Sequence, residues 1–219
     1  KTDMNSFINR YLTATVDQLN LGKDLIIDQT ETNELFMMNI KAAELAMLES
    51  SWESALLYLN SIISSLQYDE HFAFRYDLAL SVNMMYAEVN LVLRNFDSAQ
   101  STIDIILRNG KTLDDKYDAY LLLMRLLYAQ QMKNEAMCIA SDVLGQLGVQ
   151  AGWLKEDLSS VAERRKLQRK IQKAVKKLSR KKLASMKQIT DERKLKVRQL
   201  ILLHFIISTL ILSSTFTYT

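Results

Sequence analysis

Three corner segments constrain the fold of this chain more than any other feature. In each of them an alanine follows the first residue of a helical pattern by three positions. The three combinations are Trp52 with Ala55, Phe96 with Ala99, and Lys133 with Ala136. The alanines are separated by 44 and then by 37 residues. A tetratricopeptide repeat has a period of about 34 residues and keeps a small residue early in its second helix, where its two helices touch. The spacing therefore predicts a row of antiparallel helix pairs with somewhat longer first helices or corners.

Apolar residues at spacings of three and four predict a helix on each side of every corner. The expected stripes of the first helices are Leu35, Met38, Ala42 and Leu45; Leu78, Val82, Met85, Val89 and Val92; and Tyr117, Leu121, Met124 and Tyr128. The expected stripes of the second helices are Ala55, Leu59, Ile62 and Leu66; Ala99, Ile103 and Ile106; and Ala136, Ile139, Val143 and Leu147. An earlier helix, with Phe7, Tyr11, Ala14 and Leu19 as its stripe, is expected to end at Gly22.

Local signals mark several of the expected helix ends. Residues 28–31 predict a capped helix start. The stripe of the middle pair stops at Arg94 and Asn95, and we expect Asn95 to take the left-handed conformation that ends helices. Asn109 followed by Gly110 is a strong stop signal. Thr112 and Asp115 predict a capping box, in which each residue bonds the backbone of the other.

Composition agrees with an all-α fold. The chain has 219 residues, no proline and five glycines. Because proline breaks helices and marks loops, its absence favours helices joined by short corners. Charge is distributed unevenly: residues 155–198 hold 17 basic and 5 acidic side chains, and the rest of the chain holds 11 basic and 20 acidic ones. We therefore expect four regions: a tail of a preceding helical module (1–24), tetratricopeptide-like repeats (25–150), a basic helical segment (151–198) and an apolar end (199–219).

The basic segment keeps an apolar stripe. Leu167, Ile171, Val175 and Leu178 are spaced as on one helix face. Such a helix packs on the end of a repeat array as a solvated helix, lies on a membrane, or binds calmodulin or nucleic acid. The absence of aromatic residues between Leu154 and His204 argues against a platform that stacks single-stranded nucleic acid, so we expect no nucleic acid partner.

The apolar run near the C-terminus is shorter than a membrane span. It extends to Leu212 and is interrupted by His204 and Ser208. A spanning helix needs about 20 apolar residues. We expect a truncated helix or an artefactual end in residues 199–219, with a membrane tail anchor as the alternative.

The sequence lacks the residue patterns that are typical of catalytic, cofactor-binding and metal-binding sites. The lone cysteine, Cys138, excludes an internal disulfide, and its expected place is an inner helix face, where it acts as a small apolar residue. This usage favours a reducing, cytoplasmic compartment. His71 and His204 have no second histidine at helical spacing and are expected to be structural or exposed. Residues 21–24 lack the glycines and spacing of a phosphate-binding loop. We expect no catalytic, cofactor-binding or metal-binding residues.

Several stretches taken in order go beyond a generic helical repeat. They are residues 19–26, the alanine-rich pattern of 43–59, residues 74–80, 87–88, 95–99 and 111–116, and the late stretch 188–195. Over roughly residues 15–200 this order resembles the helical-repeat region of very large signalling proteins with an AAA/STAND-type ATPase. In that family a Ser/Thr-kinase-like domain often precedes the ATPase, and a GAF domain and a histidine kinase of a two-component system often follow the repeats.

The resemblance implies an internal coupling segment. The ATP site, the kinase nucleophiles and the phospho-accepting histidine of such a protein lie outside this sequence. The expected partners are the flanking domains of a longer chain and a protein or peptide held by the repeats. Residues 155–187 are more basic than the family pattern. The alternative function is a stand-alone tetratricopeptide-type adaptor, tethered to a membrane through its C-terminal end.

Overall fold

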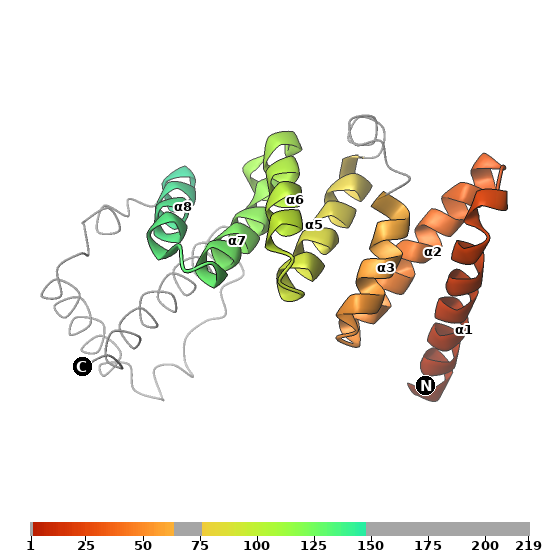
Figure 1. Cartoon of the computed structure of the whole chain (residues 1–219). Coiled ribbons are helices and arrows are strands. Elements are labelled where there is room, and N and C mark those ends of the chain that lie inside the picture. Colours follow the sequence, from red (N-terminus) through yellow and green to blue (C-terminus); the bar gives the residue numbers. More distant parts are fainter. Residues whose placement is uncertain (1, 64–75, 148–219) are drawn as a thin grey trace, which may run out of the picture. The chain divides into compact units, whose positions relative to one another are not determined.

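A computed structural model describes residues 2–63 and 76–147, and of residues 2–10 it describes the backbone alone. The described residues form seven α-helices and one short 3-10 helix, with no strand among them, which confirms the all-α class (Figure 1). The helices are α1 (Thr2–Leu21), η1 (Lys23–Leu25), α2 (Gln29–Leu48), α3 (Trp52–Ile63), α5 (Tyr76–Val92), α6 (Phe96–Asn109), α7 (Leu113–Ala129) and α8 (Lys133–Gln146).

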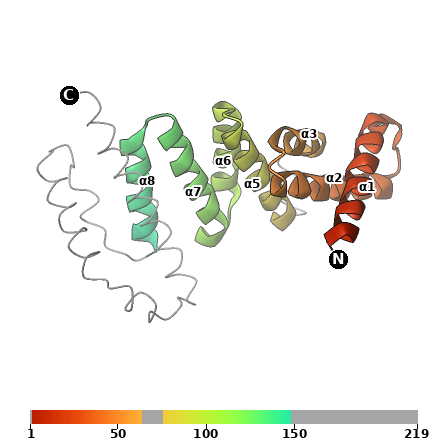
Figure 2. The same ribbon diagram turned by 90° about the horizontal axis from the view of Figure 1, so that it is seen from below.

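Two of the expected helix pairs pack tightly as antiparallel hairpins. Helices α2 and α3 lie against each other, and so do α5 and α6 (Figures 1 and 2). Helix α1 also packs on α2, and α3 packs on α5. One apolar core runs through α1, α2, α3 and α5, with Val16, Ala43, Leu59, Val82 and Val89 completely buried. Burial of these side chains is the main force that holds the helices together.

The corners inside the helix pairs share one backbone geometry. The second residue after the first helix has a positive φ at all three corners: 59° at Ser50, 61° at Arg94 and 65° at Gln131. The amide of the next residue then bonds the carbonyl five residues before it. These bonds run from Ser51 to Ala46, from Asn95 to Asn90 and from Met132 to Leu127, each at 2.8 Å. This is the Schellman motif, which satisfies carbonyls at the end of a helix.

The corner alanines have a defined place in this geometry. Ala55, Ala99 and Ala136 donate the first backbone hydrogen bond of α3, α6 and α8 to the residue that precedes each helix. All three are completely buried. The expectation that Asn95 is the left-handed residue is wrong, because Arg94 takes that conformation. Asn95 has φ −79° and already serves as the N-cap residue of α6, a position that requires a negative φ.

The capping predictions are confirmed. Asp28 precedes α2, and its carboxylate accepts bonds from the amides of Thr30 (2.9 Å) and Glu31 (3.0 Å). These bonds hold the pKa of Asp28 below its ordinary value, and the bond from the Glu31 amide has the largest effect. Thr112 and Asp115 form the expected reciprocal box: the Thr112 amide donates to Asp115 Oδ2 (2.9 Å) and the Asp115 amide to Thr112 Oγ1 (3.1 Å).

Gly110 ends α6 as expected, although its φ is −57°. A Cβ at this position would lie 2.7 Å from Cγ of Lys116 and 3.0 Å from the carbonyl oxygen of Ile106. Glycine is therefore required here by the close approach of the start of α7 and not by a left-handed backbone.

The expected stripes hold best on the second helices. Ala55, Leu59, Ile62, Ala99, Ile103, Ile106, Ala136 and Val143 are at most 1 % exposed. The stripe expected in α1 is wrong, because Tyr11 and Ala14 are exposed and Val16 is buried. Val92 is also exposed, although Val89 and Leu91 in the same turn of α5 are buried, so its side chain faces away from the packed side of the helix. The side chain of Phe7 and the predicted Leu66 lie outside the part of the chain that is described.

The chain divides into two compact units, Lys1–Leu126 and Leu127–Thr219. The first contains the helices from α1 to α6 and most of α7. In the second, the structure describes the end of α7, the third corner and α8. The basic segment and the apolar end expected at 151–198 and 199–219 lie outside the described residues.

Candidate interaction surface

The shared corner geometry places equivalent residues of the first helices in register. Eighteen residues before the corner alanine lie Met37 in α2, Ser81 in α5 and Asp118 in α7. Eleven residues before it lie Glu44, Glu88 and Arg125 in the same three helices. Seven residues before it lie Leu48 in α2 and Val92 in α5. Intervals of seven and four residues keep these positions on one helix face. All eight side chains are at least partly accessible. We call this set the first-helix row.

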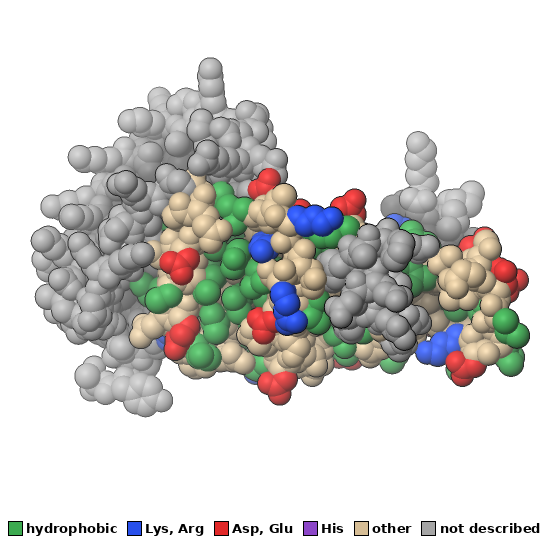
Figure 3. Space-filling view, turned by 90° about the horizontal axis from the view of Figure 1, so that it is seen from above, with side chains coloured by type: hydrophobic (Ala, Val, Ile, Leu, Met, Phe, Trp, Pro, Cys, Tyr) green, Lys and Arg blue, Asp and Glu red, His purple; other side chains and the backbone are tan. Residues whose placement is uncertain are grey.

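The first-helix row mixes apolar and charged side chains. In α2, Leu48 is 82 % exposed, and Glu44 pairs with Lys41 at 2.9 Å. Figure 3 shows one face of the molecule on which hydrophobic side chains lie among acidic and basic ones. A surface of this kind is suited to a polypeptide partner with both apolar and charged groups.

Contacts along α5 and α7 show that these two first helices lie side by side and run parallel. Near the N-terminal ends, the hydroxyl of Tyr76 donates a hydrogen bond of 2.6 Å to Oδ2 of Asp115. Further along both helices, Arg125 Nη1 lies 3.7 Å from Glu88 Oε1. The second contact joins equivalent positions of the first-helix row, so the row continues from α5 onto α7.

Tyr76 fixes the connection that leads from α6 into α7. Its oxygen accepts a hydrogen bond from the Lys111 amide (2.8 Å), and the Lys111 ammonium lies 4.2 Å from the centre of its ring. Oδ2 of Asp115 also accepts from the amides of Lys111 (3.2 Å) and Thr112 (2.9 Å). We call this set of contacts among Tyr76, Lys111, Thr112 and Asp115 the Tyr76 latch.

The latch shifts the pKa of both acidic groups. The bond from Tyr76, followed by the bond from the Thr112 amide, holds the pKa of Asp115 below its ordinary value. Burial, followed by the bond to Asp115, raises the pKa of Tyr76. Both shifts favour the state in which the phenol donates and the carboxylate accepts.

Buried asparagines provide a second kind of contact. Asn39 on α2 and Asn20 on α1 exchange two amide hydrogen bonds of 2.8 and 2.9 Å. Asn83 stands at the equivalent position of α5, and both asparagines donate to the carbonyl four residues before them. Both are 2 % exposed, but Oδ1 of Asn83 has no hydrogen-bond partner among the described residues.

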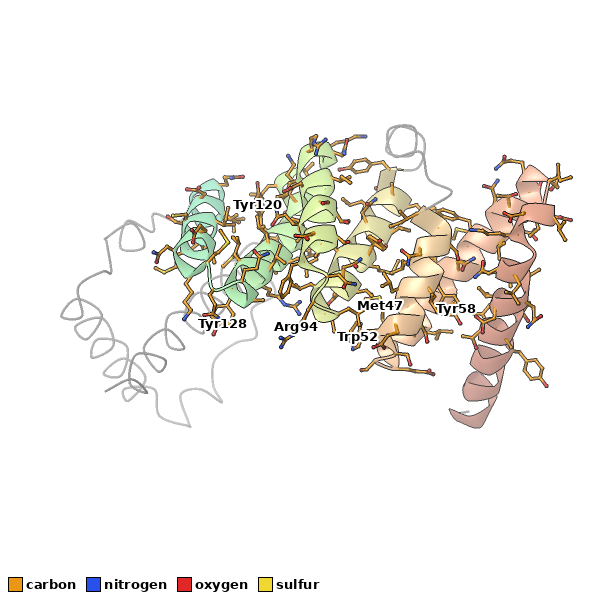
Figure 4. The ribbon with its side chains drawn as sticks, viewed as in Figure 1. Met47, Trp52, Tyr58, Arg94, Tyr120 and Tyr128 are labelled. Atoms are coloured by element: carbon orange, nitrogen blue, oxygen red, sulfur yellow. The ribbon has the colours of Figure 1, made fainter. Side chains whose placement is uncertain are left out.

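Aromatic residues complete the contacts near the first pair. Burial, and then a hydrogen bond with Asp17 of α1, raises the pKa of Tyr58 to about 12. Met47 and Trp52 pack against the core at the α2–α3 corner, and Figure 4 shows them close to that end of the pair. Arg94, at the corresponding corner of α5 and α6, extends away from the helices in the same view.

The expectation for Cys138 is wrong: this cysteine is exposed. The buried face of α8 is formed by Ala136, Ala140, Val143 and Leu144, and a residue two positions after Ala136 points to the opposite side of a helix. His71 and His204 lie outside the described residues. Within residues 2–63 and 76–147, no three His, Cys, Asp or Glu side chains are grouped as metal ligands. No described helix is both long and apolar enough to cross a membrane.

The sequence did not reveal the latch or the asparagine pair. Thr112 and Asp115 were recognisable because a capping box is a local pattern. Tyr76 lies 39 residues before Asp115, and no local pattern connects them. Asn39 and Asn83 interrupt apolar stripes at positions 44 residues apart, and this repetition was the available signal.

Comparisons of the chain with protein-family models, with curated proteins and with solved structures found no match.

Proposed function

We propose that residues 25–150 are a tetratricopeptide-like array of helix pairs that binds a polypeptide partner and performs no catalysis itself. The observation that carries this proposal is the register of the first-helix row. The same corner occurs three times, and the contact between Glu88 and Arg125 joins equivalent positions on α5 and α7. Stacked helix pairs of this type present one face of successive first helices as an extended binding surface.

The partner is expected to have apolar side chains interspersed with charges of both signs. Met37, Leu48 and Val92 supply exposed apolar surface, whereas Glu44 and Arg125 supply opposite charges. Because exposed apolar side chains gain most from burial at an interface, Leu48 and Val92 are expected to contribute more affinity than the paired charges.

A peptide-display selection on the full chain tests the binding function. Selected peptides are then titrated against wild type, the row variant Leu48→Asp with Val92→Asp, and the control Leu57→Asp. Leu57 is also exposed, but it lies on the second helix α3. The row variant is expected to lose affinity by about tenfold or more, and the control to change little. Equal affinity of the row variant and wild type would contradict the proposal, provided that circular dichroism shows unchanged helix content.

We further propose that the array acts within a longer cytoplasmic signalling protein, between an ATPase module and a kinase. The support is the resemblance of residues 15–200 to such coupling regions. Partner binding would then bias the orientation of the flanking domains through different affinities for two states. Sequencing of the native transcript tests this role. A reading frame with a phosphate-binding loop upstream and a histidine kinase downstream supports it, and a complete short message ending at Thr219 contradicts it.

A further inference from the structure

Exposed apolar side chains become fewer along the first-helix row from α2 to α7. On α2, Met37 and Leu48 are 50 % and 82 % exposed. On α5, Val92 is 37 % exposed, and the residue equivalent to Met37 is Ser81. On the part of α7 that lies in the first unit, no large apolar side chain is exposed, and the residue equivalent to Met37 is Asp118. The row therefore has an apolar end on α2.

Accessible charges change in the opposite sense. On α2, the carboxylate of Glu44 is paired at 2.9 Å with Lys41 of the same helix. On α7, Asp118 is exposed and forms no ion pair with any residue that the structure describes. Arg125 contacts Glu88 at 3.7 Å, which is long for a charge-assisted hydrogen bond. The row therefore has a charged end on α7, where a carboxylate and a guanidinium are accessible to a partner.

A packed helix presents the charged end. Met124 and Leu126, on either side of Arg125, are completely buried, and Asp115 near the start of α7 is bonded to Tyr76 of α5. The side chain of Arg125 is nevertheless 47 % exposed. The fold therefore sets the place of this guanidinium before a partner arrives, which lowers the entropic cost of binding.

We infer that the first-helix row binds its polypeptide partner in one direction. The apolar end of the partner lies on Met37 and Leu48 of α2. The other end carries charges of both signs, with a basic group at Asp118 and an acidic group at Arg125, as charge complementarity requires. In the opposite direction, apolar side chains would cover Asp118 and Arg125 and would leave both charges without water or a counter-ion, which is costly. This inference rests on the proposed function and adds the chemistry and the orientation of the partner.

Peptides selected by display on the full chain give the probe for this test. Their sequences are expected to have apolar residues at one end and charged residues at the other, always in the same order. Orientation is measured between a spin label at Glu34→Cys, an exposed site on α2, and a second label at either end of the peptide. The chain carries Cys138→Ser, which removes its exposed native thiol. The apolar end is expected to be the nearer one, with an excess of about tenfold or more over the reverse orientation.

A charge swap tests the charged end. Glu88→Arg with Arg125→Glu keeps the net charge and the paired charges but exchanges the helices that carry them. The selected peptides are expected to bind this variant about tenfold more weakly, because their acidic group then meets a carboxylate. The matched control, Asp104→Arg with Arg108→Asp, exchanges two exposed charges on the second helix α6 and is expected to leave the affinity unchanged.

The inference and the proposed function fail in different ways. Peptides that need Leu48 and Val92 but bind in both directions, or that bind the charge-swapped chain as tightly as wild type, overturn the inference and leave the proposed function intact. A selection that yields no peptide whose affinity depends on the row overturns both. If circular dichroism shows that the charge-swapped chain has lost helix content, the label distances in the chain with the native row decide the question alone.

Discussion

The corners inside the helix pairs and the connection between pairs are held in different ways. Inside a pair, a left-handed residue and two backbone hydrogen bonds reverse the chain, as at Arg94. Between α6 and α7, the chain turns at Gly110 without a left-handed residue and is held by the side chains of Asp115 and Tyr76. Tyr76 belongs to the first helix of the preceding pair.

This difference shows where sequence matters in a helical array. The corner residues have little in common, since Ser50, Arg94 and Gln131 occupy the same position. A backbone motif tolerates this variation because its bonds do not involve side chains. The connection at Gly110 requires particular residues, one of which, Tyr76, lies 35 positions before the Lys111 whose amide it binds. Helix pairing is therefore expected to survive substitutions that loosen the stacking of one pair on the next.

The largest effect is expected inside a pair, at a corner alanine. Ala99 is completely buried, so Ala99→Leu forces extra carbon atoms into a filled space and is expected to destabilise the chain by about 1–3 kcal/mol. Urea unfolding followed by circular dichroism measures this. The matched control is Ala14→Leu on the exposed face of α1, with an expected change near zero. A similar stability of both variants would show that Ala99 is not at a close helix contact.

The two equivalent asparagines, Asn39 and Asn83, test what buried polar side chains outside the corners contribute to stability. Asn39→Leu breaks the reciprocal amide pair and leaves Asn20 without that partner, so a loss of about 1–3 kcal/mol is expected. Asn83→Leu removes an oxygen that has no partner among the described residues, and it is expected to be neutral or stabilising. Both variants are compared in the same unfolding assay. An equal loss at the two positions would contradict this assignment.

These two asparagines also show how far the sequence leads. Periodicity predicted the helices, because burial of one face is a local regularity of 3.6 residues. It predicted the faces less well at helix ends, where Val92 is exposed, and at α8, where Cys138 lies opposite the buried side. It did not predict that Asn39 bonds Asn20 or that Tyr76 bonds Asp115, because such contacts depend on how helices are placed in space.

The latch is expected to have the next largest effect. Tyr76→Phe removes the hydroxyl that joins α5 to the start of α7, and a loss of about 1 kcal/mol is expected because the bond is charged but half-exposed. The thermal unfolding midpoint measures it, with Tyr86→Phe as the matched control. If both variants unfold at the same temperature, the hydroxyl of Tyr76 does not contribute to stability.

Glycine at the left-handed positions is expected to stabilise the corners. Ser50→Gly, Arg94→Gly and Gln131→Gly each remove the steric cost of a Cβ at positive φ, partly offset by the greater freedom of glycine when unfolded. A gain of about 0.5 kcal/mol per site is expected. The unfolding midpoint in urea measures each variant. A loss of stability at all three sites would contradict the shared corner geometry.

The smallest effect on stability is expected when the pH is lowered. The folded-state pKa of Asp115 is lowered from 3.8, so its carboxylate contributes stability above that value, and this contribution is lost as the pH falls through the folded-state pKa. The pKa of Asp28 is also lowered, so the contribution of Asp115 is isolated by comparing wild type with Asp115→Asn. Unfolding of both proteins is measured between about pH 6 and pH 2, a range that brackets ordinary carboxyl pKa values. The stability difference between the two proteins is expected to shrink on acidification. A constant difference would contradict the assignment.

Hydrogen exchange of backbone amides tests the contrast between corners and connections most directly. In Tyr76→Phe, the amide of Lys111 loses one of its acceptors, whereas the amides of Ser51 and Asn95 keep their backbone acceptors. We expect exchange at Lys111 and Thr112 to be about tenfold faster or more, with exchange at Ser51 and Asn95 unchanged. Faster exchange at Asn95, or unchanged exchange at Lys111, would contradict the account that pairs hold their own corners while remote side chains hold the connections.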